Sequence, residues 1–208
     1  MIKAITFDFD MTLIDSLTAG NKAIEDMKTE IGLLTKGMTA KQLWGMNHLD
    51  FIKKIIEIND SNIKVKELSE FNKKSMIKHY INCELYDIET LKKLKDRKLK
   101  LGIISNNSSF VINKVLNNEY NKKIKFDFIM GIEDESSKTN LLNKLLKKLN
   151  LQPKQMAYVG DHPNDIIAAK QAGVVAIGVT TGLHTKEELE KEGAIFVLRS
   201  LKELENIV

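Results

Sequence analysis

The chain has 208 residues, of which 43% are hydrophobic and 29% are charged, and its formal net charge is +4. This length suffices for one good core with a small insertion, and the hydrophobic content excludes a disordered chain. The positive charge is mild, and only 6% of the residues are aromatic. Because nucleic-acid binding needs a concentrated basic patch with interleaved aromatic residues, we expect no nucleic-acid partner.

Membrane and secretion signals are also missing from the pattern. Apolar runs reach only about six residues, far short of a membrane span, so we expect no membrane partner. The chain begins directly with a strand pattern rather than a signal peptide, and its single Cys83 cannot form an internal disulfide. These features predict a cytoplasmic protein. Lysine pairs such as Lys147 and Lys148 are expected on solvated helix faces.

The first predicted element is a short buried strand at Lys3–Phe7, which is apolar and β-branched. It runs straight into two carboxylates, Asp8 and Asp10. Residues two apart in an extended chain point the same way, so these carboxylates repel each other unless a cation or a shared proton intervenes. A hard cation such as Mg²⁺ is the simplest compensation.

The next segment, residues 16–82, has a pattern that predicts helices throughout. Apolar residues recur at helical spacing in three places, and glycines with the cluster Asn59–Asn62 separate them. We therefore predict a small all-helical domain at 16–82, inserted into a core made of residues 1–15 and 83–208.

From Asp87 onward, predicted helices and strands alternate. The expected strands lie at 99–104, 126–130, 156–159, 174–179 and 194–198, and the expected helices at 88–98, 109–117, 139–149, 164–171, 186–192 and 201–207. Such alternation favours parallel pairing with right-handed crossovers, hence an α/β core with a doubly wound, Rossmann-like parallel sheet. Short apolar strands fit a sheet that is covered on both faces.

Polar residues follow the predicted strands, at the end where ligands bind in such sheets. After the first strand come Asp8 and Asp10, after the second Ser105-Asn106-Asn107, and after the third the loop that leads to Lys138. The fourth is followed by Gly160–Asp165, which contains Asp161. The sequence thus predicts one constellation of carboxylates, a hydroxyl, amides and a lysine.

Asp8-Phe9-Asp10-Met11-Thr12-Leu13 resembles the Asp-x-Asp-x-Thr-Leu signature of the haloacid dehalogenase-like (HAD) superfamily. Ser105, Lys138 and the Asp161/Asp165 pair match its later motifs in order. The helical insertion is similar to the small helical cap of the phosphoglycolate phosphatase-like branch. Two departures stand out. Met11 occupies a position where Gly is commonest, and Thr139 follows the lysine where Pro is common.

The resemblance implies a phosphatase in which Asp8 is the nucleophile, forming an aspartyl-phosphate, and Asp10 is the general acid/base. It implies Mg²⁺ held by Asp8, Asp161 and the backbone carbonyl of Asp10. Asp165 is expected either to bind the ion directly or to lie behind its ligands, where it orients Lys138 or orders a metal-bound water. Lys138 supplies fixed positive charge beside the nucleophile. The groups expected to bind the substrate phosphate are Thr12, Ser105, Asn106 and Lys138.

The substrate expected from the resemblance is a small phosphorylated metabolite of the phosphoglycolate or sugar-phosphate type. A phosphomutase would use the same motifs, and the cap would decide between the two. A dehalogenase is disfavoured by Asp10, and a non-catalytic binding protein by the complete set of motif residues. The sequence leaves a monomer and a homodimer equally open.

Four further residues near the motifs or in the helical segment have expected structural roles. His162 is expected to face solvent from its loop, and Asn164 to cap the helix that follows Pro163. Trp44 and Met46 are expected to serve mainly in packing, with a role in lining a substrate pocket as the alternative.

Overall fold

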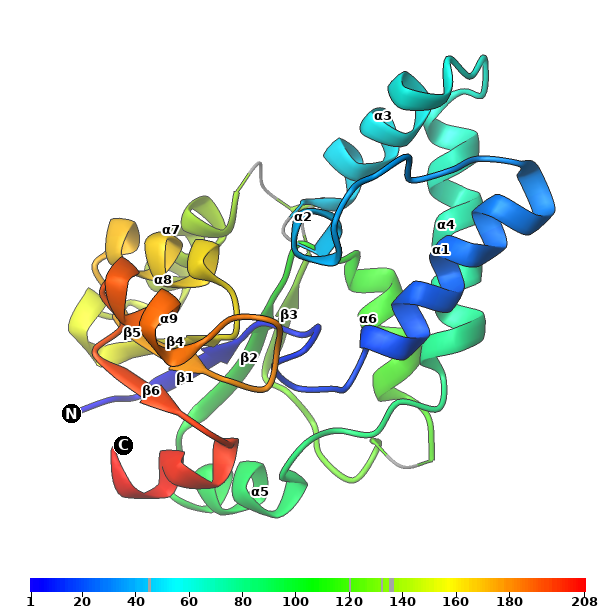
Figure 1. The fold of residues 1–208 in the computed structure, drawn as a ribbon. Helices are drawn as coiled ribbons and strands as arrows, with labels where there is room; N and C mark the ends of the chain where they lie inside the picture. The colour runs from blue at the N-terminus through cyan, green and yellow to red at the C-terminus, as the bar shows by residue number, and fades with distance from the viewer. Residues whose placement is uncertain (45, 120, 132, 135–136) are drawn as a thin grey trace.

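The computed structural model describes residues 1–44, 46–119, 121–131, 133–134 and 137–208, with the side chains of residues 40 and 41 left aside. Its centre is a six-stranded parallel sheet in the order β3-β2-β1-β4-β5-β6 (Figure 1). The strands are β1 (Ala4–Phe7), β2 (Lys100–Ile104), β3 (Phe128–Met130), β4 (Met156–Gly160), β5 (Val175–Val179) and β6 (Phe196–Leu198).

Both faces of the sheet are covered, as the apolar strands lead one to expect. One apolar cluster joins strand residues such as Ile5 and Phe7 to α5 (Ile88–Asp96), α6 (Ser109–Leu116) and the 3₁₀ helix η2 (Leu201–Asn206). The other joins Tyr158 and its neighbours to α7 (Lys138–Leu149), α8 (Pro163–Ala172) and α9 (Lys186–Glu192). A short 3₁₀ helix, η1 (Pro153–Gln155), precedes β4.

The strand order places the topological switch point of the sheet at β1. Strands β2 and β3 lie on one side of β1 and strands β4 to β6 on the other, so the winding reverses there. In open α/β sheets, ligands bind at the carboxyl ends of the strands at such a switch point. Asp8 and Asp10 follow β1 immediately, and Asp161 follows β4.

Between β1 and α5 the described residues form four helices: α1 (Leu17–Ile31), α2 (Ala40–Trp44), α3 (His48–Asn59) and α4 (Val65–Tyr80). They stand beside the sheet as a separate lobe, with both chain termini on the other lobe (Figure 1). This lobe has an apolar cluster of its own, which includes Met27, Ile52 and Leu68. No helix of the described residues is both long and apolar enough to cross a membrane.

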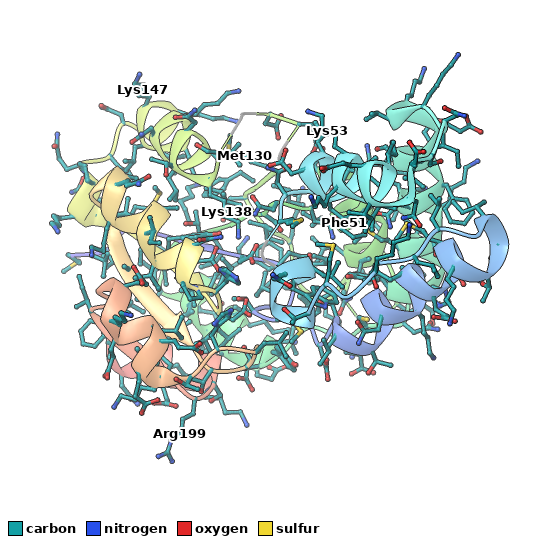
Figure 2. All side chains as sticks on the ribbon, turned by 45° about the horizontal axis from the view of Figure 1, so that its top comes forward. Phe51, Lys53, Met130, Lys138, Lys147 and Arg199 are labelled. Atoms are coloured by element: carbon teal, nitrogen blue, oxygen red, sulfur yellow. The ribbon has the colours of Figure 1, made fainter. Side chains whose placement is uncertain are left out.

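The alternating α/β pattern predicted from the sequence is confirmed, with shifts of one or two residues at most ends. The closing segment is the main departure: it forms the 3₁₀ helix η2 rather than an α-helix. Lys147 and Lys148 are exposed, as expected, and Figure 2 shows Lys147 on the outside of α7 while Lys138, at the other end of that helix, lies toward the middle of the molecule.

Candidate active site

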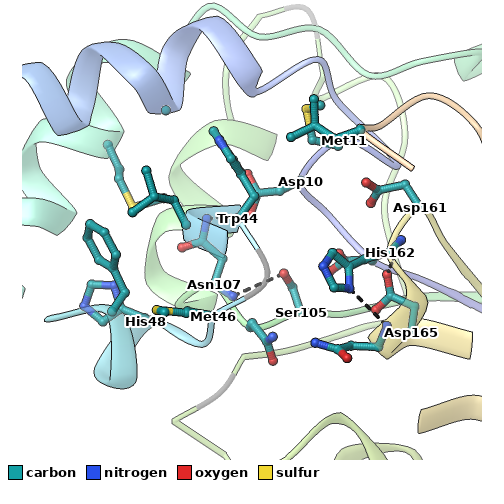
Figure 3. A pocket seen from close by; sticks show the side chains of 18 of the residues that line it. Asp10, Met11, Trp44, Met46, His48, Ser105, Asn107, Asp161, His162 and Asp165 are labelled. Carbon is teal, nitrogen blue, oxygen red and sulfur yellow. Dashed lines mark hydrogen bonds between the residues drawn. The ribbon is translucent and has the colours of Figure 1, made fainter. Parts of the chain in front are cut away.

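A pocket lies between the carboxyl ends of the strands and the four-helix lobe (Figure 3). Its core side is lined by most of the residues that the sequence singles out, namely Asp8, Asp10, Ser105, Asn106, Lys138, Asp161 and Asp165. Segments as far apart in the chain as Asp8 and Asp165 therefore meet here, because parallel strands bring their carboxyl ends to one edge.

Lys138 is the positive centre of this constellation. Its ammonium group lies 3.0 Å from Asp8 Oδ2 and 2.5 Å from Asp165 Oδ1. Asp165 is fully buried and also accepts hydrogen bonds from the backbone N–H of His162 and the hydroxyl of Tyr158. Burial alone would lower the pKa of Lys138, but Asp165 and Asp8 together raise it above its ordinary value. The lysine is therefore a permanent charge.

Asp8, Asp161 and Asp165 form a cluster in which one carboxylate oxygen from each lies within 4.8 Å of the others. Burial raises the pKa of Asp8 despite Lys138, and burial together with repulsion from Asp165 and Asp8 raises the pKa of Asp161. Thr12 donates a 3.0 Å hydrogen bond to Asp161 Oδ1, whereas Asp8 Oδ1 is buried without a hydrogen-bond partner among the described residues. Three carboxylates facing one lysine leave negative charge that a cation would offset.

Asp10 lies on the side of the pocket toward the helical lobe. Asn107 donates a 3.0 Å hydrogen bond to Asp10 Oδ2, and the hydroxyls of Ser16 and Tyr80 lie beside the same carboxylate without a hydrogen bond of good geometry. Burial, followed by repulsion from Asp8, raises the pKa of Asp10 to about 6, against the lowering effect of these three neighbours. A carboxyl group in this range can both give and take a proton near neutral pH.

The groups expected to bind phosphate are distributed around this centre. Ser105 and Asn106 line the pocket at the end of β2, and the Ser105 hydroxyl accepts a 3.2 Å hydrogen bond from the backbone N–H of Asn107 (Figure 3). Thr12, in contrast, is buried with its hydroxyl turned to Asp161. The structure thus brings Ser105, Asn106 and Lys138 into the pocket and places Thr12 behind it.

Local backbone requirements explain two features of the loops. Met11 has φ of 61°, the left-handed region that favours glycine, and its carbonyl accepts a 2.5 Å hydrogen bond from the Thr181 hydroxyl. A Cβ at Gly182 would lie 1.8 Å from Asp161 Oδ2, so only glycine leaves room for that carboxylate. Met11 therefore adopts, with a side chain, a backbone conformation that favours glycine.

Two contributors to the site were not predicted from the sequence. Tyr158 and Gly182 contact the motif carboxylates, but only the tertiary fold brings them there. Asn107 was expected among the amides that follow the second strand, and the structure shows that its partner is Asp10. The expectation for Asn164 was wrong, because His162 caps α8 by accepting a hydrogen bond from the Asn164 N–H.

His162 was also expected to face solvent, and that expectation was wrong as well. Its ring lines the pocket and packs edge-to-face on His184, with ring centroids 4.5 Å apart. Trp44 and Met46 likewise line the pocket while they pack against apolar clusters, so both readings of these two residues apply.

Comparison with known proteins agrees with this geometry. The sequence model described as haloacid dehalogenase-like hydrolase matches residues 5–179. The chain belongs to the haloacid dehalogenase-like hydrolase family. It is similar to the phosphoglycolate phosphatase of Vibrio vulnificus (strain CMCP6), with 29% identity over 100% of this chain and 96% of the relative. It is also similar to the phosphoglycolate phosphatase of Colwellia psychrerythraea, with 28% identity over 97% and 95% of the two chains.

Solved structures of the family share the fold. CbbY of Rhodobacter sphaeroides, in complex with phosphate, superposes with a TM-score of 0.82 at 19% identity, covering 98% of this chain and 96% of the other. A haloacid dehalogenase-like family hydrolase of Streptococcus pneumoniae gives 0.80 at 21% identity, covering 99% and 98%. With the curated relatives, these findings make the chain a phosphoglycolate phosphatase-like member of the family and a phosphoric monoester hydrolase.

Proposed function

We propose that this haloacid dehalogenase-like phosphatase hydrolyses a small phosphorylated metabolite in two steps through an aspartyl-phosphate at Asp8, with Mg²⁺ as cofactor. The observation that carries the proposal is the Asp8 carboxylate itself. It is buried in the pocket, one oxygen lies 3.0 Å from Lys138, and the other has no hydrogen-bond partner among the described residues. A nucleophile needs such a free oxygen.

The neighbours of Asp8 suit the two steps. Asp10 would protonate the leaving alkoxide and then take a proton from the water that releases phosphate, and its pKa of about 6 suits both tasks. Ser105, Asn106 and Lys138 would hold the phosphate oxygens, since they line the same pocket. Thr12 would contribute through the backbone of its loop, because its side chain is taken up by Asp161.

The carboxylate cluster fits a hard divalent cation. Asp161 accepts a hydrogen bond from Thr12, and one carboxylate oxygen from each of Asp8, Asp161 and Asp165 lies within 4.8 Å of the others. We assign the ion to Asp8, Asp161 and the backbone carbonyl of Asp10. Asp165 would hold Lys138 in place, because both of its oxygens already accept hydrogen bonds. Bound Mg²⁺ would neutralise charge on the phosphoryl oxygens.

Two substrate types fit the family. The curated relatives named above are phosphoglycolate phosphatases, which makes phosphoglycolate the first candidate and a sugar phosphate the second. A phosphomutase of the same family would use the same carboxylates and return the phosphoryl group to its substrate. Measuring phosphate release and isomerisation on the same sugar phosphate separates the two activities.

The helical lobe would act as a cap. We propose domain limits of 16–82 for the cap and of 1–15 with 83–208 for the catalytic core, with hinges near Asp15–Leu17 and Asn82–Tyr86, where the chain crosses between the lobes. Closure would exclude water from Asp8 before attack. Burial raises the pKa of Cys83 to about 11, so this hinge thiol stays unreactive. We also propose a cytoplasmic location, on the grounds of the single cysteine.

The first test is Asp8→Asn, with p-nitrophenyl phosphate as substrate and a Mg²⁺ titration. A neutral amide cannot accept the phosphoryl group, so kcat should fall by at least about 10³-fold while the circular dichroism spectrum is unchanged. The matched control is Asp96→Asn, an exposed carboxylate on α5, which should keep wild-type turnover. Wild-type rates in Asp8→Asn, or turnover that is independent of added metal, would overturn the proposal.

A further inference from the structure

The wall of the pocket opposite the catalytic carboxylates is apolar. All four helices of the cap or the loop between them contribute to it, through Ile24, Leu43, Trp44, Met46, Phe51 and Met76. Figure 3 shows Trp44 and Met46 facing the same space as Asp10 and Ser105. Because Asp8 and Lys138 fix the phosphate on the core side, the leaving group of a bound substrate must lie against this wall.

The polar groups on the same wall are neutral at pH 7. His48 is buried, and one of its ring nitrogens pairs with the Ser69 hydroxyl at 2.8 Å. Burial, with a smaller effect from Lys73, lowers the pKa of His48 to about 4. Asn72, 3% exposed, adds an amide. Among the side chains described on the cap side of the pocket, none is a lysine or an arginine.

A carboxylate and an alkyl group would behave oppositely against this surface. Burying a carboxylate without a cation is strongly unfavourable even beside neutral donors such as the Trp44 Nε1–H, which has no hydrogen-bond partner among the described residues. Covering an apolar wall with methylene groups is favourable. Lys138 is the basic residue of the described pocket nearest the reaction, and Asp8 and Asp165 already share it, at 3.0 and 2.5 Å. It is thus committed to the core side of the pocket.

We propose that the preferred substrate carries an uncharged leaving group with an apolar face, a neutral alcohol rather than a hydroxy acid such as glycolate. This rests on the proposed phosphatase function and selects between its two substrate types. The apolar cap wall then acts as the specificity-determining surface, and its neutral polar groups orient the alcohol.

The direct test compares two substrates with the same two-carbon backbone, 2-phosphoglycolate and 2-hydroxyethyl phosphate, by phosphate release with Mg²⁺ present. We expect kcat/KM to be at least about 10-fold higher for the neutral ester. In the series ethyl, propyl and butyl phosphate, kcat/KM should rise about 3- to 4-fold per methylene, in line with the transfer of that group from water to an apolar surface. A preference for phosphoglycolate, or no dependence on chain length, would overturn the inference.

A pair of variants tests the wall itself. Met46→Lys places a cation on the wall, and Leu49→Lys places the same charge at an exposed position of α3, where Leu49 is 45% exposed. Met46→Lys should raise the ratio of phosphoglycolate to 2-hydroxyethyl phosphate turnover about 10-fold, whereas Leu49→Lys should leave it unchanged. Equal ratios in both variants would contradict the role of the wall. If Met46→Lys does not fold, the wild-type substrate series alone decides.

The two proposals fail in different ways. If p-nitrophenyl phosphate is hydrolysed with Mg²⁺ and Asp8→Asn abolishes this activity, a preference for phosphoglycolate overturns only the leaving-group inference. If no phosphomonoester is hydrolysed with Mg²⁺, the proposed function fails, and the inference fails with it.

Discussion

At the scale of single residues, two of the non-glycine residues with left-handed backbone lie in contrasting surroundings. Met11, in the catalytic loop, has φ of 61° and is held by the hydrogen bond from Thr181. Lys98, in the exposed turn between α5 and β2, has φ of 63°. A side chain in this region costs about 1 kcal/mol relative to glycine. Contacts within the site maintain the left-handed backbone conformation at Met11. Lys98 lies in a turn outside the site.

Lys98→Gly should therefore stabilise the protein by about 0.5–1 kcal/mol, because glycine adopts positive φ without a Cβ clash and its extra freedom in the unfolded chain offsets part of the gain. Urea unfolding followed by circular dichroism measures the change. Lys98→Ala is the control and should show no gain, since alanine keeps the Cβ. A gain of the same size in the alanine variant would assign the effect to the lysine side chain instead.

The residues of the site differ in whether the sequence predicts their positions. Asp8, Asp10, Ser105 and Asp161 follow predicted strands closely, and Lys138 ends the loop that follows another strand. Topology alone therefore predicts that they gather at one edge, and the structure gathers them. Their partners could not be predicted in the same way. Asn107 contacts Asp10 and Gly182 lies against Asp161 only because of the tertiary fold. Local sequence spacing does not predict such contacts between distant segments.

At the scale of elements, one carboxylate links α1 to α4, the two longest helices of the helical lobe, through hydrogen bonds. Asp26 on α1 accepts hydrogen bonds from Ser75, Lys78 and His79 on α4, at 2.5, 3.2 and 2.8 Å. The Ser75 hydrogen bond is the main cause that lowers the pKa of Asp26 to about 2 from 3.8. The ionised form is thus favoured in the folded state, and this preference stabilises the packing of α1 against α4.

Asp26→Asn should lower the free energy of unfolding at pH 7 by about 1 kcal/mol, after allowance for solvent screening around these partly exposed groups. Since the folded pKa lies below the unfolded one, the contribution of Asp26 is complete above about pH 4 and disappears as the pH falls through 2. Urea unfolding of both proteins should therefore show a difference that shrinks over this interval. Glu25→Gln, a neighbouring exposed carboxylate, is the control, and an undiminished difference at low pH would refute the assignment.

Element boundaries were predictable where capping signals are local. The helix at 186–192 agrees with α9 because Thr185 and Glu188 form a capping box and Gly193 ends the helix in the left-handed conformation. The start of α8 was less predictable, because its cap is a histidine rather than one of the usual short polar residues. The 3₁₀ geometry of η2 has no periodicity that would distinguish it from a short α-helix.

At the scale of the whole molecule, the carboxylate cluster would link the stability of the protein to the binding of the proposed cation. Asp8 and Asp161 come from different strand ends and repel each other, and this repulsion raises the pKa of Asp161 after the larger effect of burial. A cation that binds only the folded arrangement stabilises the whole chain by mass action.

Mg²⁺ at about 100 times its Kd should stabilise the protein by roughly 2.7 kcal/mol, which corresponds to a rise in Tm of about 5–10 °C for a chain of this size. Thermal unfolding with and without the ion measures the rise, with sodium chloride of equal ionic strength as the control. Asp161→Ala should lose most of the rise, while Asp96→Ala, at an exposed site on α5, should retain it. A full rise in Asp161→Ala would place the ion elsewhere.

The position of β1 in the sheet has a consequence for biosynthesis. Among the strands of this sheet, β1 is synthesised first and lies in its interior, and its two edges pair with β2 and β4, whose first paired residues are Lys100 and Met156. Until both have been synthesised, a nascent chain exposes an apolar strand with at least one open edge. The helices of the cap are complete much earlier and have their own apolar cluster. We therefore expect the cap to become compact first, and the unfinished core to be the species that chaperones bind and that aggregates when translation stalls.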